Sequence, residues 1–491
     1  MTVAETSELS AAVPTGLYID GRWQDAASGA VFDVIDPSTG AVIARVADAT
    51  VDDGEAALAA AHRAQEGWSR TAPRERAEIL RRAFELTVER TELIALTMTL
   101  EMGKPLAESR AEVAYGAEFL RWFSEEATRI SGRFATAPDG KNRLMVIKRP
   151  VGPCLFITPW NFPLAMAARK VAPAIAAGCT SVLKPAALTP LTALLFAQIL
   201  EDAGLPAGVL NVIPTSRAGA VTAPLISDER LRKLSFTGST EVGKRLIAAS
   251  ADQVLRVSME LGGNAPFLVF DDADLEAAVE GAVLAKLRNG GEACVAANRF
   301  VVHESIAKEF SEKLTARMGS YVLGRGSEPG TTLGPLVDEA TRTKVAELVA
   351  GALAEGAVAT IGGASVDGPG YFYPATVLTG VPLSAHILTE EIFGPVAPIV
   401  TFSDEDEAVR IANASEYGLV CFVYTRDLNR ALRMSERLET GMLGMNTGLV
   451  SNPAAPFGGV KQSGLGREGG SEGIEEYLET SYIGIADPFS V

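Results

Sequence analysis

The sequence predicts an α/β protein with two doubly wound α/β domains and a small β excursion. From residue 151 onwards, short apolar runs that resemble buried strands alternate with helical stretches. These runs are VGPCLFIT, SVLK, VLNVI, KLSF and APFLVF. A second such series contains RFVVHE, APIVTF and LVCFVYT. This alternation indicates βαβ units and parallel sheets. The 491 residues are enough for two to four domains at roughly 150 residues each.

The regions before and after these two series show hairpin, helix and strand patterns. Residues 17–47 contain short alternating runs broken by Gly and Pro, which predict β-hairpins. Residues 53–127 place apolar residues three and four positions apart, which predicts helices. We expect a two-stranded excursion at 129–149, with which EEYLETSYIGIAD could pair, within the chain or across subunits. The helices expected in the two series span 164–178, 190–203, 217–227, 241–250, 305–318, 338–354, 404–414 and 427–438.

Composition narrows the choice of partners and compartment. The formal net charge of −17 argues against nucleic acid or an anionic membrane as a partner, so an anionic substrate would need a local positive pocket. The four cysteines show no CxxC pair and no metal-ligand spacing, which favours free thiols in a reducing cytoplasm and no metal site. No signal-peptide pattern or membrane span is visible, so we expect a cytoplasmic protein.

Cys294 differs from the other cysteines in its setting. It follows a glycine-rich turn in LRNGGEACVAANRF and precedes a strand. A thiol presented by a turn can be reached by a ligand, and nearby N–H dipoles can stabilise its thiolate. A lone cysteine is more often a small buried hydrophobe, and Cys154, Cys179 and Cys421 lie in apolar runs that favour this interpretation. Cys294 is therefore the candidate nucleophile.

Two further polar residues stand in unusual surroundings. Glu260 interrupts an apolar run in VSMELGGNAPF, where burial would raise its pKa and make it a competent base near neutrality. Asn161 lies in the stiff, proline-flanked turn of ITPWNFPLAMAARK, from which its amide could face a developing oxyanion. The alternatives are a satisfied buried Glu and an ordinary turn Asn.

These three segments together resemble the aldehyde dehydrogenase superfamily. The resemblance extends through VLKPAALTP (182–190), FTGSTEVG (236–243), EEIFGPV (390–396) and PFGGVKQSGLGRE (456–468). It covers the chain from about residue 17 to the C-terminus, with several independent motifs in the same order. A lone glycine motif would be a weak signal, and the sequence contains no GxGxxG.

The resemblance implies a role for each matching residue. Cys294 would be the nucleophile, Glu260 the general base, and Asn161 an oxyanion donor together with the backbone N–H of Cys294. The implied cofactor is NADP, with NAD as the alternative. The residues that would bind the cofactor are Lys184 at the adenine-side ribose, Gly238 and Ser239 at the pyrophosphate, Glu391 and Phe393 at the nicotinamide ribose, and Trp160 and Leu261 along the cleft. Lys170 and Glu468 match positions with a structural role.

The resemblance also implies a division of the chain. Residues 14–128 and 150–258 would form the dinucleotide-binding domain, and residues 259–462 the catalytic domain. Residues 129–149 and 478–491 would be oligomerisation strands of a homodimer or homotetramer.

Within the superfamily, the sequence most resembles succinate-semialdehyde dehydrogenases. Arg169 and Arg288 occupy two places that would line the aldehyde tunnel, where relatives acting on apolar aldehydes commonly have aromatic residues. Two guanidiniums fit the distal carboxylate of a small-molecule aldehyde, here a four-carbon semialdehyde, and Ser451 matches a third carboxylate contact. The alternative for either arginine is a surface position or a pair with an internal acid.

Three departures from the pattern modify these expectations. Glu292 in GEAC replaces the Gln of GQTC and would add a negative charge near the thiol. Ala296 stands where some relatives have a second cysteine, so we expect no redox switch there. Ala187 replaces the acid found in NAD-specific members, which leaves room for the 2′-phosphate of NADP.

Four alternatives remain at the level of the sequence. The substrate could be glutarate semialdehyde or another ω-carboxy aldehyde. The thioester could pass to coenzyme A, although Glu260 argues for hydrolysis. A thiol hydrolase would need a histidine beside Cys294, and no histidine lies in a matching motif. Finally, a protein of this fold could bind ligands without catalysis.

Overall fold

The strands expected between residues 151 and 260 form the centre of an eight-stranded sheet. The structure is a computed structural model that describes residues 12–489. The sheet order is β2-β1-β9-β8-β7-β10-β11-β21, and the five strands from β9 to β11 run parallel. Its strands are β1 (Leu17–Ile19), β2 (Arg22–Gln24), β7 (Cys154–Ile157), β8 (Ser181–Lys184), β9 (Leu210–Val212), β10 (Lys233–Thr237), β11 (Arg256–Glu260) and β21 (Gly464–Leu465).

Helices cover both faces of this sheet, which explains why β7 and β8 are apolar and buried on both sides. The region 53–127, expected to be helical, consists of four helices. The helices are α2 (Val51–Arg70), α3 (Pro73–Glu89), α4 (Thr91–Met102), α5 (Leu106–Glu126), α6 (Pro163–Ala177), α7 (Pro190–Asp202), α8 (Ala218–Ser227) and α9 (Thr240–Ser250). Helix α6 is buried along its whole length, starts at a proline and ends at Gly178, whose φ of +92° suits glycine.

The second series forms a seven-stranded sheet of order β14-β15-β16-β13-β12-β18-β19. Its strands are β12 (Ala265–Val269), β13 (Ala297–His303), β14 (Val358–Ile361), β15 (Thr376–Thr379), β16 (Val396–Phe402), β18 (Val420–Tyr424) and β19 (Met442–Met445). Helices α10 (Leu275–Leu287) and α11 (Ala307–Gly319) pack in one core beside it. Helices α12 (Glu339–Ala354), α13 (Glu405–Asn413) and α14 (Leu428–Arg437) pack in the other.

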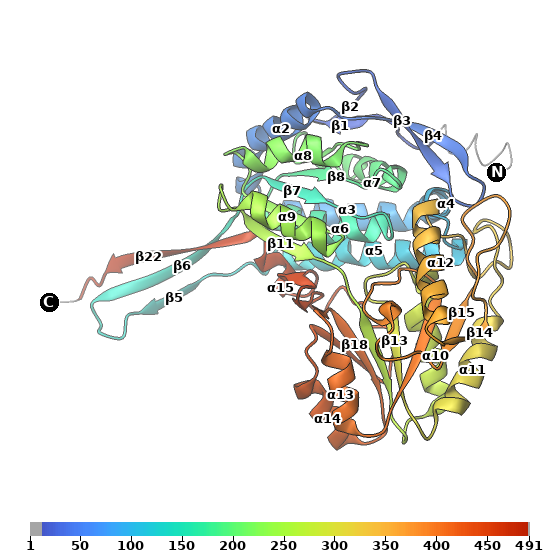
Figure 1. Ribbon diagram of the computed structural model, residues 1–491. Coiled ribbons are helices and arrows are strands. Elements are labelled where there is room, and N and C mark those ends of the chain that lie inside the picture. Colours follow the sequence, from blue (N-terminus) through green and yellow to red (C-terminus); the bar gives the residue numbers. More distant parts are fainter. Residues whose placement is uncertain (1–11, 490–491) are drawn as a thin grey trace.

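Helix α10 was not among the expected helices. Its sequence, LEAAVEGAVLAKL, is mostly small and apolar, so no polar stripe marks one face of it. The fold class is as predicted: two α/β units, each with helices on both faces of its sheet (Figure 1).

A three-stranded arm projects from the molecule (Figure 1). Strand β22 (Leu478–Ala486) pairs with β6 (Asn142–Pro150), which pairs with β5 (Arg133–Thr136), so the predicted pairing forms within one chain. Residues 490–491 of the expected oligomerisation strand lie outside the described residues. The remaining elements are β3 (Val31–Asp36), β4 (Ala41–Ala47), β17 (Tyr417–Gly418), β20 (Val460–Lys461), α15 (Glu472–Glu475) and the short 3-10 helices η1 (Arg288–Gly291) and η2 (His386–Leu388).

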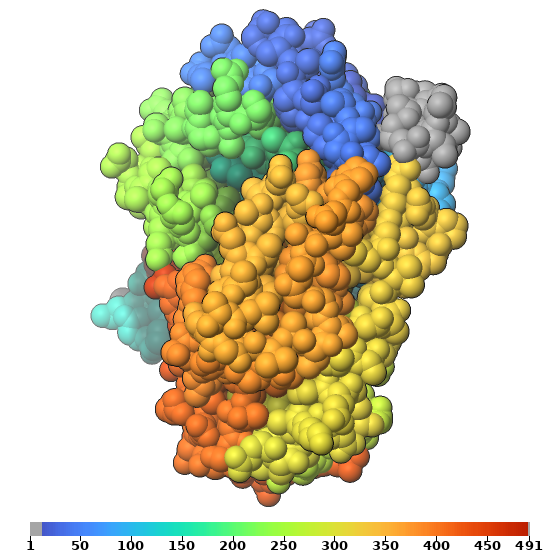
Figure 2. All heavy atoms as spheres, turned by 45° about the vertical axis from the view of Figure 1, so that its right-hand side comes forward, coloured from blue at the N-terminus to red at the C-terminus, as the bar shows by residue number. Residues whose placement is uncertain are grey.

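The carboxyl ends of β7, β8, β10 and β11 lie at one edge of the first sheet, because these strands are parallel. In an open α/β sheet this edge is where ligands bind. The surface is hollowed where the blue-to-green part of the chain meets the orange part (Figure 2). No described helix combines the length and the apolar character that crossing a membrane requires.

Candidate active site

Cys294 lies at the end of residues 288–294, which we call the thiol loop. Three consecutive residues of this loop have left-handed backbone conformations: Asn289 at φ +56°, Gly290 at +63° and Gly291 at +81°. A Cβ on Gly291 would lie 2.2 Å from the carbonyl oxygen of Gly394, so only glycine allows this close approach. Cys294 is half-buried, whereas the other three cysteines are buried, and this agrees with the distinction made from the sequence.

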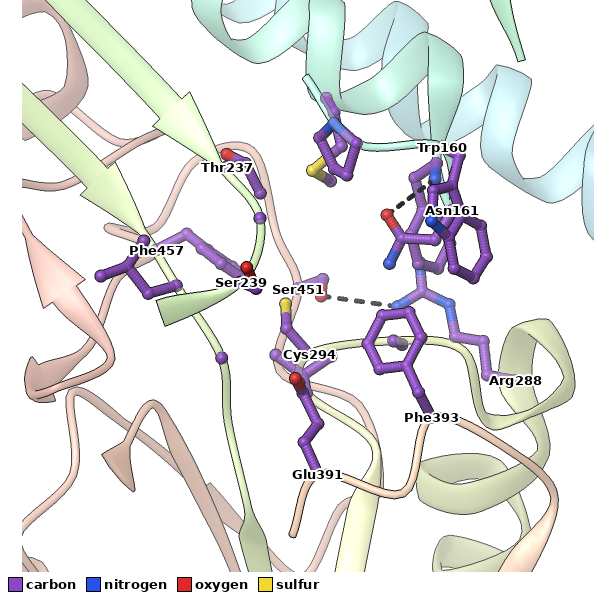
Figure 3. A pocket seen from close by; sticks show the side chains of 18 of the residues that line it. Trp160, Asn161, Thr237, Ser239, Arg288, Cys294, Glu391, Phe393, Ser451 and Phe457 are labelled. Carbon is purple, nitrogen blue, oxygen red and sulfur yellow. Dashed lines mark hydrogen bonds between the residues drawn. The ribbon is translucent and has the colours of Figure 1, made fainter. Parts of the chain in front are cut away.

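The thiol faces a cavity of about 270 Å³ between the two sheets (Figure 3). Eleven of the fourteen predicted site residues line it, namely Cys294, Asn161, Trp160, Gly238, Ser239, Leu261, Glu391, Phe393, Arg169, Arg288 and Ser451. Three do not line it: Glu260, Lys184 and Ala187. The fold therefore brings residues from both halves of the chain around one thiol.

Asn161 follows β7 in the turn before α6 and is buried. Its Nδ2 donates a hydrogen bond to the Glu292 carbonyl oxygen in the thiol loop at 2.9 Å. Its Oδ1 accepts from the Phe162 N–H at 3.1 Å. An amide NH2 has two N–H donors, so one remains for a ligand in the cavity.

Glu260 is the last residue of β11 and is buried outside the cavity wall. Neither carboxyl oxygen has a hydrogen-bond partner among the described residues. Burial, and then the nearby Glu468 charge, hold the pKa of Glu260 well above its ordinary value, while Arg169 and Lys170 oppose the shift. As the sequence suggested, the carboxyl is buried, and it must reorient toward the cavity to act on a ligand there.

The pKa of the Cys294 thiol is raised, so the thiol loses its proton only at high pH. Burial raises the pKa of Cys294 to about 12, and the Glu391 and Glu260 charges add to the shift, while Arg169 lowers it. A neutral thiol is a weak nucleophile, so this site needs a base to take the proton of Cys294.

On one side of the thiol, two aromatic rings and two backbone segments form the cavity wall. Trp160 and Phe393 meet edge to face, with ring centroids 5.5 Å apart (Figure 3). The side chain of Ser239, which precedes α9, does not cap the helix, so the first-turn N–H groups of α9 are available to an anion. Glu391 accepts from the Gly263 N–H at 3.1 Å, and burial raises its pKa to about 7. This wall is suited to a phosphate-bearing ligand that also carries a flat ring.

Lys184 and Ala187 lie farther along the same sheet edge. Lys184 ends β8, and Ala187 lies in the turn after it. Burial alone lowers the pKa of Lys184 to about 8, with no charged neighbour contributing. A buried cation of this kind is suited to an anionic or hydroxyl-rich ligand that extends beyond the cavity.

On the other side of the thiol, a guanidinium cluster consists of Arg169, Arg288, Ser451 and Tyr115. Arg288 Nη1 donates to Ser451 Oγ at 3.5 Å (Figure 3), and its guanidinium lies 5.0 Å from the centre of the Phe162 ring. The cluster supplies the local positive charge that an anionic substrate would need in so acidic a protein.

Arg169 is only partly available to a ligand. Its Nε donates to Glu468, which also accepts from Lys170, and its guanidinium stacks 4.1 Å from the centre of the Phe457 ring. Its Nη2 is buried without a hydrogen-bond partner among the described residues. Both interpretations of Arg169 therefore apply: it pairs with an internal acid and also lines the cavity.

Tyr115 is a cavity residue that sequence reasoning missed. It lies on α5 and lines the cavity with Arg169 and Ser451, and its ring centre lies 5.7 Å from the Arg288 guanidinium. Burial raises its pKa, so it remains a neutral hydroxyl donor. A tyrosine within a predicted helix carries no local signal of this role, because its partners are distant in the sequence.

The side chain of Glu292 does not face the cavity. Its Oε1 accepts from the Val337 N–H at 3.0 Å, and burial holds its pKa well above the ordinary value. Both observations weaken the expectation that Glu292 adds a negative charge near the thiol. Its carboxyl instead links the thiol loop to Val337, in the segment that precedes α12.

Comparison with known proteins agrees with this geometry. The model of the aldehyde dehydrogenase family matches residues 23–483. A succinate-semialdehyde dehydrogenase of Paenarthrobacter nicotinovorans is 64% identical over 91% of this chain and 100% of its own length. A glutarate-semialdehyde dehydrogenase of Pseudomonas putida is 48% identical over 96% of this chain and 97% of its own. The crystal structure of an Escherichia coli NADP-dependent enzyme, 48% identical, superposes with a TM-score of 0.96 and covers 97% of this chain and 99% of that one.

Proposed function

Because the chain belongs to the aldehyde dehydrogenase family, we propose that it oxidises succinate semialdehyde to succinate through a thioester on Cys294, with NADP as hydride acceptor. One observation carries the proposal: the cavity that exposes the thiol also contains the guanidinium cluster. A small aldehyde with a distal carboxylate would place its two ends at these two groups. The substrate named for the Paenarthrobacter relative supports the choice.

In the first half of the reaction, Cys294 Sγ bonds to the aldehyde carbon. Glu260 takes the thiol proton, which the high pKa of Cys294 makes necessary. The carbonyl electron pair moves onto oxygen, where the free N–H of Asn161 Nδ2 and the backbone N–H of Cys294 stabilise the negative charge. A bound nicotinamide supplies a two-electron hydride acceptor, so that the substrate carbon is left as a thioester.

The residues present fit a nicotinamide dinucleotide. The uncapped start of α9 at Gly238 and Ser239 would hold the pyrophosphate, and Lys184 the adenine-side ribose. Glu391 would bind the nicotinamide ribose. NADP is preferred in the proposal because Ala187 puts no acid beside a 2′-phosphate, and the Escherichia coli structure, described as NADP-dependent, supports it. NAD is the alternative.

In the second half, Glu260 first releases the thiol proton to solvent, and water then attacks the thioester carbon. Glu260 takes a proton from this water, the carbon–sulfur bond breaks, and the carboxylic acid leaves. The thiolate of Cys294 takes the proton back from Glu260, which restores the thiol. A base that activates water would hydrolyse the thioester before coenzyme A could accept the acyl group, so hydrolysis is the proposed outcome.

We assign residues 14–128 and 150–258 to cofactor binding and residues 259–462 to catalysis.

The guanidinium cluster would hold the distal carboxylate. Arg288 and Arg169 Nη2 offer charged donors, while Ser451 and Tyr115 offer hydroxyls. Glutarate semialdehyde is the second candidate substrate, favoured by the Pseudomonas relative.

The assembly proposed is a homodimer or homotetramer formed through the arm. The compartment proposed is the cytoplasm, which the four free thiols support.

A side-by-side substrate panel tests the proposal. Succinate semialdehyde, glutarate semialdehyde and butanal are each assayed with NADP and NAD by the absorbance of the reduced cofactor. The proposal expects the highest kcat/KM for succinate semialdehyde with NADP, and the same product with or without coenzyme A. A preference for butanal would exclude the carboxylate subsite, and an acyl-coenzyme A product would exclude hydrolysis.

A further inference from the structure

Asn289 occupies the most constrained position of the thiol loop. It is 1% exposed and has a φ of +56°, a region that asparagine adopts more readily than other non-glycine residues. It lies five residues before Cys294 and does not line the cavity. Asn289 therefore cannot contact a substrate directly, and any effect on the reaction must act through its neighbours.

The side chain of Asn289 joins two separate segments of the chain. Its Nδ2 donates to the carbonyl oxygens of Asn161 and Glu292, both at 3.0 Å. Asn161 Nδ2 donates to the same Glu292 oxygen at 2.9 Å. The turn that carries the oxyanion donor and the loop that carries the thiol are thus tied together by one closed set of hydrogen bonds.

This bridge is anchored by residues of α5 and by Lys104, which precedes it. The backbone N–H of Asn289 donates to Glu108 Oε2 at 2.6 Å. Lys104 Nζ donates to the Asn161 carbonyl oxygen at 2.7 Å and to Glu112 Oε2 at 2.6 Å. Glu112 in turn accepts from the first N–H groups of α6, the helix that follows Asn161. Two side chains, Lys104 and Asn289, therefore donate to the Asn161 carbonyl. Of these two, only Asn289 belongs to the thiol loop.

We infer that Asn289 is a positioning residue, which sets the place of the Asn161 amide relative to Cys294 and acts on the reaction through Asn161. The inference rests on the proposed roles of Asn161 and Cys294. A donor stabilises charge in a transition state only when it is already aimed at the site where the charge develops. Without Asn289, the bond from Asn161 Nδ2 to the Glu292 carbonyl would still join the Asn161 turn to the thiol loop, but the Asn161 carbonyl would lose its bond to that loop.

The test uses two variants of the full-length protein. Asn289→Gly keeps the left-handed backbone and removes the amide, and Asn289→Asp keeps the shape and removes the donors. The rate of the first-turnover hydride burst should fall about 10- to 100-fold in both, the scale expected for a displaced oxyanion donor. KM for the cofactor and the alkylation rate of Cys294 by iodoacetamide should stay near wild type, since neither depends on Asn161.

Asn211 provides a matched control. It is buried in β9, and its Nδ2 also donates to two backbone carbonyls, those of Ser181 at 3.1 Å and Gly208 at 3.0 Å. Asn211→Ala should lower Tm and leave the burst rate unchanged. An equal loss of burst rate in Asn211→Ala would mean that general destabilisation explains the effect, and the inference would be overturned.

A double-mutant cycle gives the decisive result. If Asn289 acts through Asn161, adding Asn289→Gly to Asn161→Ala should change the burst rate by less than about threefold. Losses that multiply, a wild-type burst in both Asn289 variants, or a changed alkylation rate would each overturn the inference. A wild-type protein that reduces neither NADP nor NAD with any aldehyde would refute the proposed function instead.

Discussion

At the scale of single residues, Arg169 and Arg288 are chemically alike but differ in their surroundings. Arg288 contacts Ser451 and aromatic rings, with no acid as a hydrogen-bond partner among the described residues. Arg169 is tied to Glu468 and stacked on Phe457. Removing either should weaken binding of a distal carboxylate, but only Arg169 also supports the buried acid beside Lys170.

Arg288→Ala should therefore lower kcat/KM selectively for aldehydes that carry a distal carboxylate. A hydrogen bond between charged groups contributes roughly 1.5–3 kcal/mol, so kcat/KM for succinate semialdehyde should fall about 10- to 150-fold. Butanal, which has no carboxylate, should be little affected, and Arg288→Lys should not fully restore activity because lysine lacks the planar fork. Arg169→Ala should reduce activity on both aldehydes and lower Tm. If Arg288→Ala affects both aldehydes equally, Arg288 does not bind the carboxylate.

Glu260 should give the reaction a pH dependence with a definite sign. Its pKa is raised, so the protonated form dominates below that pKa and the basic form grows above it. Deacylation should consequently speed up as pH rises, and Glu260→Gln should abolish this rise. Because Glu260 is proposed to take the thiol proton as well, Glu260→Gln should also lose the hydride burst. A burst that is kept and then stalls would mean that Glu260 only activates water. Stopped-flow measurements over a pH series distinguish these outcomes.

At the scale of elements, the turn after β8 should set the choice between NADP and NAD. Lys184 and Ala187 lie within four residues of each other at the carboxyl edge of the first sheet. An acid at position 187 would repel a 2′-phosphate and bond a free 2′-hydroxyl. Ala187→Glu should lower kcat/KM for NADP about tenfold or more relative to NAD, which corresponds to about 1.4 kcal/mol.

Ala187→Gln is the control for size, because it adds a side chain of similar length without the charge. It should shift the cofactor preference much less than Ala187→Glu. Equal losses with NADP and NAD in Ala187→Glu would indicate that the adenine-side ribose binds elsewhere.

At the scale of the whole molecule, the arm exposes apolar side chains that a monomer would leave in water. Phe134 is 63% exposed, Tyr482 61% and Phe489 83%. Phe134 and Tyr482 lie on the strands of the arm, and Phe489 follows β22. Large apolar side chains exposed on a projecting sheet favour a contact with another protein chain. We expect the double variant Phe134→Asp, Tyr482→Asp to shift a homodimer or homotetramer toward smaller species.

Light scattering coupled to size-exclusion chromatography measures this shift. Leu428→Asp is a suitable control, because Leu428 is 73% exposed on α14, away from the arm (Figure 1). It should leave the assembly unchanged. A wild-type monomer across the concentration range would contradict the proposed assembly outright.

The local sequence determined the order of the helices and strands and the choice of the candidate nucleophile. Buried strands such as SVLK, the amphipathic periods of 53–127 and the glycine-rich turn before Cys294 depend on neighbouring residues, so the order of elements and the candidate thiol could be predicted. Other features depended on tertiary structure because their partners are far apart in the chain. Arg169 meets Glu468, 299 residues away, and Asn289 meets Asn161, 128 residues away. Tyr115 joins the guanidinium cluster, and Glu260 lies outside the cavity wall, because packing between distant segments sets their places and leaves no pattern in the local sequence.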